Sequence, residues 1–344
     1  MRKNCLALML AALLAAPVWA GVVKKTKTNV TFKGFGNFSS SQTTKLTAEQ
    51  ERMDSVNDFK GKGVLGKLAG KAMMRSGEVG QIIDLPATTM YTLDHKKKEY
   101  TASPIKPLQE QLGEGGQKEK REEAEEAGKT EDSDIKVTRS EFKVTDTGET
   151  SNINNFECRK YIASWITEWE NVKTGEKGSS NLETLTWTTA PTETLLKAQE
   201  EEMKFSREYM KKIGINAEQF QQDLLGANWM SMLDAFSRKP SSTKQDFSKF
   251  SDEMKKIKGY PIVIDGKLLM SGTKPAGEAE EEPKSGGGLM GGLAKKLLKK
   301  KKAPADESQG PEPALTYYIE VQEITLSDLG AGDFQVPPDY KKKG

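Results

Sequence analysis

Two residues beyond position 20 have side chains that could do chemistry on their own, His95 and Cys158. His95 is the only histidine, so no second one is present to share a metal or complete a catalytic triad. It follows Asp94 in a turn-forming segment, and we expect an exposed turn residue. Cys158 lies in an aromatic-rich strand segment in which Arg159 would point to the opposite face. We therefore expect a buried structural cysteine, with an intermolecular disulfide as the alternative.

The segment GKGVLGKL, residues 61–68, has the glycine and lysine spacing of a phosphate-binding loop. Leu68 stands where such a loop needs Ser or Thr to bind magnesium, and no apolar strand leads into it. Carboxylates occur in runs such as Glu122–Glu126, which are typical of solvated surfaces rather than of an acid and base pair. We therefore expect no nucleotide, cofactor or metal site, and a protein that is not an enzyme.

Two tracts of similar composition stand out, GVLGKLAGKAMMR at 63–75 and GLMGGLAKKLLKK at 288–300. On a helical wheel of about 100° per residue each tract places apolar side chains on one half and lysines on the other, as in helices that lie in a membrane interface. The side chains predicted to contact a membrane or ligand are Val64, Leu65, Leu68 and Met73 in the first tract, and Leu289, Met290, Leu293, Leu297, Leu298, Lys295, Lys296 and Lys299 in the second. The alternatives are a helical hairpin of the two tracts over the mouth of a barrel, and a flexible loop.

Residues 1–20 have the organisation of a secretory signal peptide. Arg2 and Lys3 precede the apolar stretch Leu6–Ala16, and small residues follow, so we expect cleavage after Ala20 and a location in the periplasm or beyond. Removing Arg2 and Lys3 brings the formal net charge from +2 to zero, which argues against a nucleic-acid partner. No later stretch approaches the roughly 20 apolar residues that a membrane-spanning helix needs.

Strands predominate among the elements that would position these residues. Residues 22–42 alternate polar and apolar side chains and predict one strand, with Gly34 and Gly36 allowing a bulge or a sharp coil. The other predicted strands cover residues 45–62, 77–103 as hairpins, 134–148, 156–176, 180–191, 258–272 with a hairpin at Asp265-Gly266, and 314–329.

A helical block is predicted from Thr192 to Lys258, with Thr192 as its cap. Within it Met203, Ser206, Met210 and Ile213 share one helical face, and a wide apolar stripe between Phe220 and Phe236 predicts the strongest helix of the chain. Strands, then helices, then strands again predict an α+β fold with an antiparallel sheet and helices on one of its faces.

Several segments occur together in a known order along the chain. They are VTFKGFGNF, IIDLPATTMYTLDHKKKEYT, CRKYIASWITEW, LETLTWTT, KGYPIVIDG and DFQVPPDYKKK. In these segments the chain resembles an uncharacterised bacterial family of secreted proteins that is related in shape to the periplasmic lipoprotein carriers LolA and LolB. The resemblance implies a strongly curved antiparallel sheet, a half-barrel closed by helices that holds acyl chains in the carriers. We expect a single domain of this kind over residues 21–344, with flexible insertions at about 61–76, 109–133 and 272–313; the acidic segment and the Gly-rich insertion depart from the compact carriers.

The sequence thus predicts a non-catalytic envelope protein that binds an apolar ligand, an acyl chain or a lipid surface through a half-barrel and two basic flaps. The alternative is a structural module that engages other envelope proteins and has no small ligand. Trp165, Trp169, Trp187 and Trp229 could line an apolar pocket, or could simply fill a core.

Overall fold

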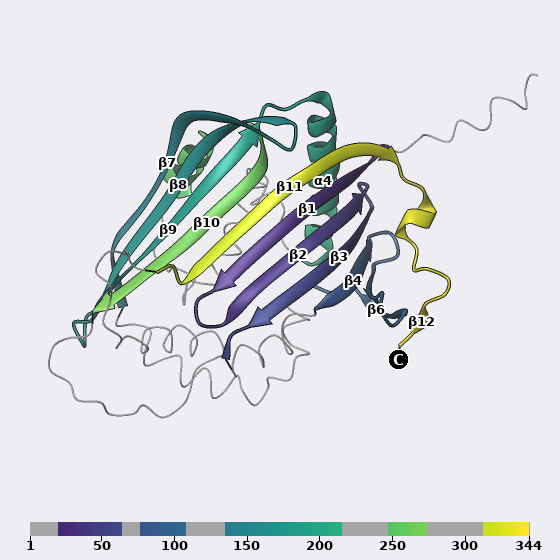
Figure 1. The fold of residues 1–344 in the computed structure, drawn as a ribbon, viewed down its shortest axis with the longest axis horizontal. Helices are drawn as coiled ribbons and strands as arrows, with labels where there is room; N and C mark the ends of the chain where they lie inside the picture. The colour runs from purple at the N-terminus through teal and green to yellow at the C-terminus, as the bar shows by residue number, and fades with distance from the viewer. Residues whose placement is uncertain (1–19, 64–75, 108–134, 215–246, 274–311, 344) are drawn as a thin grey trace, which may run out of the picture.

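Most of the described chain is one twelve-stranded sheet, which Figure 1 shows with a helix lying across it. The structure is a computed structural model that describes residues 20–63, 76–107, 135–214, 247–273 and 312–343. The strands are β1 (Ala20–Phe32), β2 (Gly36–Leu46), β3 (Gln50–Gly61), β4 (Gly77–Asp84), β5 (Thr89–Asp94), β6 (Glu99–Pro104), β7 (Ile135–Ile153), β8 (Phe156–Asn171), β9 (Lys177–Thr189), β10 (Tyr260–Thr273), β11 (Leu315–Asp328) and β12 (Lys341–Lys342). The helices are α4 (Glu193–Lys212), α6 (Phe247–Met254) and the single-turn η2 (Ala331–Phe334).

The strand order is β12-β6-β5-β4-β3-β2-β1-β11-β10-β9-β8-β7. Neighbouring strands are antiparallel except at one edge, where β12 runs parallel to β6. The antiparallel sheet predicted from the sequence is therefore present in a large, open and mixed form. The α+β prediction holds only in part, because strands dominate and the described helices are few.

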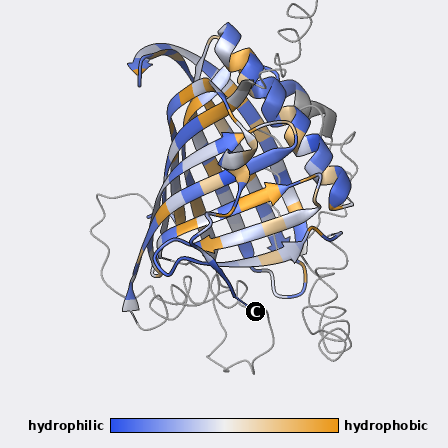
Figure 2. Cartoon of the chain, turned by 90° about the vertical axis from the view of Figure 1, so that its right-hand side faces the viewer, coloured by the Kyte–Doolittle hydropathy of each residue, from blue (hydrophilic) through white to orange (hydrophobic). Residues whose placement is uncertain are grey.

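The sheet bends around α4. Cys158 of β8 and Ile83 of β4 lie far apart in the strand order, yet both belong to the same buried cluster as Leu195 and Phe205 of α4. Figure 2, a side view, shows strands both in front and behind as the sheet curls. We call the face on which α4 and α6 pack the helical face.

Helix α4 begins as the sequence predicts, but it buries a different face. The Thr192 hydroxyl accepts a hydrogen bond from the Leu195 backbone N–H (3.3 Å) and caps the helix. The buried residues are Leu195, Ala198 and Phe205. On the face predicted through Met203, Met203 itself is 39 % exposed, whereas Ile213 packs against the core. Phe205 stacks on Tyr209, and this larger aromatic surface determines which side of the helix meets the sheet.

The predicted first strand is in fact a hairpin. Residues 33–35 form the turn that joins β1 to β2, and Gly34 adopts a positive φ of 77° there. Gly36 follows with its backbone against the end of β3, where a Cβ atom would lie 2.3 Å from the Lys60 carbonyl oxygen. These glycines therefore make a tight turn rather than the predicted bulge or coil.

The hairpin predicted at Asp265-Gly266 is also wrong, because β10 runs straight through these residues. Gly266 lies beneath the ring of Tyr317, and a Cβ atom at this position would lie 2.0 Å from Tyr317 Cζ. The Tyr317 hydroxyl crosses β10 to hydrogen-bond Thr184 of β9 at 2.6 Å. The glycine makes room for an aromatic ring and does not turn the chain.

Candidate functional site

All twelve side chains predicted to contact a membrane or ligand lie in residues 64–75 and 274–311, outside the described residues. The strand ends that flank these two insertions are described. The first insertion leaves β3 at Gly61 and returns at Gly77, and the second leaves β10 at Thr273 and returns at Leu315. Pairing of Gly61 with Gly36, and of Phe32 with both Gly36 and Leu315, puts these flanks at one end of the sheet, which we call the insertion end.

The turn between β1 and β2 joins the flanks of the two insertions directly. The Lys62 N–H donates to the Phe35 carbonyl (2.6 Å), and the Lys33 N–H donates to the Ala314 carbonyl (3.0 Å). The Lys33 ammonium pairs with Glu312 at 2.8 Å. Lys33, with a smaller effect from Lys62, holds the pKa of the Glu312 carboxyl below its usual value. The start of the first insertion and the end of the second therefore lie beside one small basic turn.

Apolar side chains reach the insertion end on the helical face. Val137 of β7 pairs with Trp169 of β8, and the Trp169 ring lies over Gly178, where a Cβ atom would come within 2.2 Å. Val137 is 46 % exposed, and Met270 of β10 is 41 % exposed. This part of the face is therefore an open apolar margin rather than a closed core.

The tryptophans divide between the two predicted roles. Trp165 lines a small apolar hollow, and its ring meets Phe142 and Phe250 of α6 at centroid distances of 6.2 and 5.9 Å. Trp187 packs against the main core with Cys158. Trp229 lies outside the described residues.

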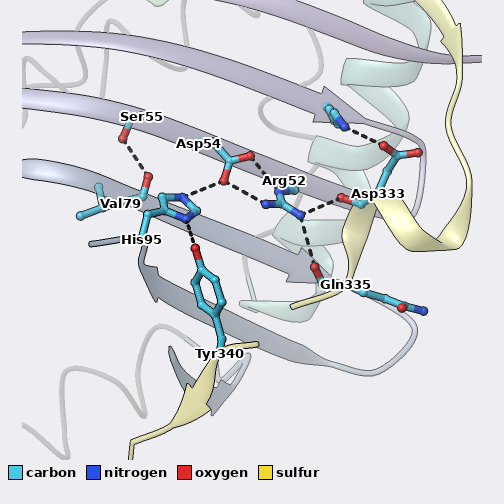
Figure 3. Close-up of polar contacts among 9 residues, drawn as sticks. Arg52, Asp54, Ser55, Val79, His95, Asp333, Gln335 and Tyr340 are labelled. Carbon is cyan, nitrogen blue, oxygen red and sulfur yellow. Dashed lines mark hydrogen bonds and ion pairs between the residues drawn. The ribbon is translucent and has the colours of Figure 1, made fainter. Parts of the chain in front are cut away.

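His95 is the residue whose environment differs most from the prediction. It lies in the β5–β6 turn as expected, but its side chain is only 18 % exposed, so the prediction of an exposed residue is wrong. Its Nδ1 lies 2.7 Å from the Tyr340 hydroxyl, and its Nε2 lies 3.0 Å from Asp54 Oδ1 (Figure 3). The second contact is an ion-pair geometry rather than an aligned hydrogen bond. The contact between His95 and Asp54 requires a glycine at position 80, because a Cβ atom there would lie 2.7 Å from His95 Nε2 and 2.8 Å from Asp54 Oδ1.

The same network attaches the C-terminal segment to the face opposite α4. Arg52 donates through Nε to Asp54 (2.8 Å) and through Nη1 to the carbonyls of Asp333 (3.3 Å) and Gln335 (3.2 Å). Lys45 pairs with the Asp333 carboxylate at 2.6 Å, and this pairing lowers the pKa of Asp333. The network therefore attaches the C-terminal segment to the sheet, and the Tyr340 hydroxyl is the hydroxyl that contacts His95 in it. The Ser55 hydroxyl instead donates to the Val79 carbonyl (3.5 Å).

A half-buried ionic cluster lies at the other end of β1, between the sheet and α4. Lys24 of β1 is paired with Glu202 of α4, and the Tyr260 hydroxyl donates to both Glu202 oxygens at 3.2 Å. Glu51 of β3 adds a second carboxyl, and its pKa is raised to about 7, mainly by burial, with Glu202 adding to the rise and Lys24 opposing it. Burial raises the pKa of Tyr260 to about 12. The sequence analysis missed this cluster, since Lys24 sits in an ordinary alternating strand.

Cys158 is confirmed as a buried free cysteine, 2 % exposed. Burial raises the pKa of its thiol, which disfavours the reactive thiolate. Arg159 points to the opposite face and pairs with Asp146 at 2.7 Å, as the alternation along the strand predicts.

Within the described residues no group of three or more His, Cys, Asp or Glu side chains could hold a metal ion. In the same part of the chain, no helix has the length and apolar character to cross a membrane. No protein-family model matches the chain, and comparisons with curated proteins and with solved structures give no match either.

Proposed function

We propose that this protein is a non-catalytic envelope protein, exported to the periplasm by its signal peptide, that binds a lipid surface or an apolar ligand at the insertion end of its sheet. The observation that carries the proposal is the convergence of both insertions on the β1–β2 turn. The insertions that contain the two tracts predicted to be amphipathic and basic are attached to one end of the sheet, and the first begins and the second ends beside this turn. Tracts that leave from one end can meet the same surface together.

Two further features support the proposal. The apolar margin formed by Val137, Trp169 and Met270 lies at the insertion end, where acyl chains or an apolar ligand would cover it. The sheet curls around α4, in keeping with the half-barrel that the resemblance to the lipoprotein carriers implies. A half-barrel of this kind would offer its apolar concave side through the end that α4 leaves open.

Vesicle flotation tests the proposal. The full mature chain should float with vesicles that contain phosphatidylglycerol, weakly with pure phosphatidylcholine, and less as salt rises. Deleting Gly286–Lys302 should reduce binding at least about tenfold, since it removes much of the basic amphipathic surface. The matched control deletes a segment of equal length, Glu110–Glu126, from the acidic insertion and should bind as the full chain does.

Two results would contradict the proposal. Full binding after deletion of Gly286–Lys302 would mean that this tract is not the contact. Absence of vesicle binding, together with a specific protein partner in crosslinking, would favour the structural module instead.

A further inference from the structure

Two lysine triplets that are remote in sequence lie side by side at one corner of the sheet. Lys96–Lys98 form most of the β5–β6 turn, and Lys341–Lys343 form β12 and the residue after it. The Lys341 N–H donates to the Lys98 carbonyl (2.9 Å), and the Lys343 N–H donates to the Tyr100 carbonyl (2.7 Å). All six lysines are exposed, and we call this set the lysine corner.

Contacts of the C-terminal segment with the sheet hold the triplet Lys341–Lys343 beside the triplet Lys96–Lys98. The Tyr340 hydroxyl bonds His95 at 2.7 Å, immediately before the first triplet, and Asp339 pairs with Lys98 at 2.7 Å. Upstream, Phe334 is 4 % exposed and packs with Ile82 and Leu93 on the same face. The His95 network thus has a structural consequence: it holds the two lysine triplets of the lysine corner together.

The lysine corner carries more positive charge than its own carboxylates offset. Asp94 pairs with Lys97 at 3.4 Å, and Asp339 pairs with Lys98. The other four lysines have no ion pair with a carboxylate in the part of the chain that the structure describes. Ammonium groups held close together repel one another, and an anionic surface relieves that repulsion.

We infer that the lysine corner binds the anionic headgroups of a lipid membrane. The inference rests on the proposed function and extends it to a second contact. The β5–β6 turn lies on the side of β4 where Gly77 begins the strand, and the C-terminus lies toward the same end of the molecule as the β1–β2 turn (Figures 1 and 2). A broad anionic surface that meets the insertion end therefore reaches these lysines as well. Small anions would engage only a few of the six.

The test compares two triple variants of the full mature chain. Lys341→Gln, Lys342→Gln and Lys343→Gln together remove half of the lysine corner without changing the backbone bonds of β12. The matched control replaces Lys197, Lys204 and Lys211 on α4 by Gln, which removes the same charge far from the corner. Each lysine near an anionic surface contributes about fivefold to binding, so the corner variant should bind phosphatidylglycerol vesicles roughly a hundredfold more weakly. The α4 variant should bind within about threefold of the unaltered chain.

The outcomes separate this inference from the proposed function. If the unaltered chain binds no vesicles, both fail. If deletion of Gly286–Lys302 abolishes binding but the corner variant binds normally, only the lysine corner inference fails. Equal loss in the corner and α4 variants would mean a general charge effect and would overturn it. Tighter binding of the unaltered chain to single-stranded RNA than to vesicles would overturn the lipid assignment.

Discussion

Neutralising Glu51 should stabilise the protein above neutral pH and leave it unchanged in mild acid. Glu51 lies between the sheet and α4, beside the paired Lys24 and Glu202, and its pKa is raised to about 7 from 4.5. Because burial is the main cause, the ionised carboxylate is the form that the folded state disfavours. Glu51→Gln keeps the size and polarity of the side chain and removes its titration.

The direction in which stability changes with pH follows from how many protons the folded and unfolded states bind. Between pH 4.5 and 7 the folded protein keeps a proton on Glu51 that the unfolded chain has lost, so stability falls as pH rises through this window. A shift from 4.5 to about 7 corresponds to about 3 kcal/mol, an upper limit because Glu51 is coupled to Lys24 and Glu202. The free energy of unfolding of Glu51→Gln should therefore equal that of the unaltered chain near pH 4 and exceed it by up to about 3 kcal/mol at pH 8.

Urea unfolding followed by tryptophan fluorescence measures this difference, with Trp187 packed against the same core. The exposed residue Glu157 of β8 provides the control, since Glu157→Gln is the same substitution outside the cluster around Lys24 and Glu202. Other carboxylates affect both proteins alike and cancel in the difference. Parallel stability curves for Glu51→Gln and the unaltered chain from pH 4 to 8 would refute the argument that Glu51 is buried and protonated.

Three further predictions concern packing and reactivity. Gly80→Ala should cost about 1–3 kcal/mol in urea unfolding, and part of that cost should vanish in a His95→Ala background, because the added Cβ atom meets the His95 ring as well as Asp54 Oδ1. Gly266→Ala should cost about 3 kcal/mol, since it drives Tyr317 off β10; a change below about 0.5 kcal/mol would show that the ring moves freely. Cys158 should react with a thiol reagent slowly in the folded protein and rapidly in urea, because it is buried and its pKa is raised; fast reaction in buffer would contradict its burial.

Local patterns sufficed for much of the fold. Strand alternation predicted β7, β8 and β9 close to their observed bounds, and Thr192 proved to be the cap of α4. Cys158 could be predicted to be buried because free cysteines usually behave as small apolar residues. The order of strands and helices also indicated an antiparallel sheet with a helix on one face.

Predictions failed where a distant partner decides the outcome. The Asp-Gly pair at 265–266 is a strong local turn signal, but here the glycine lies within a strand, where its missing side chain leaves space for the ring of Tyr317 from β11. His95 reads as an exposed turn residue until Tyr340, 245 positions away, covers it. Lys24 is one of several lysines in its strand, and only its position opposite Glu202 of α4, 178 positions away, makes it a half-buried ion.

The two ends of the sheet therefore differ in physical character. At the end crossed by α4, Lys24 and Glu202 form a half-buried ion pair, so replacing either one alone would leave an unpaired, half-buried charge and destabilise the fold. At the insertion end, lysines are exposed and several are unmatched among the described residues, so their replacement should leave stability nearly unchanged. Changes at Glu51 should move the unfolding curve but not vesicle binding, and changes at Lys341–Lys343 should do the reverse. Comparing these two sets of variants tests whether the lysines without an ion-pair partner contribute to binding rather than to folding stability.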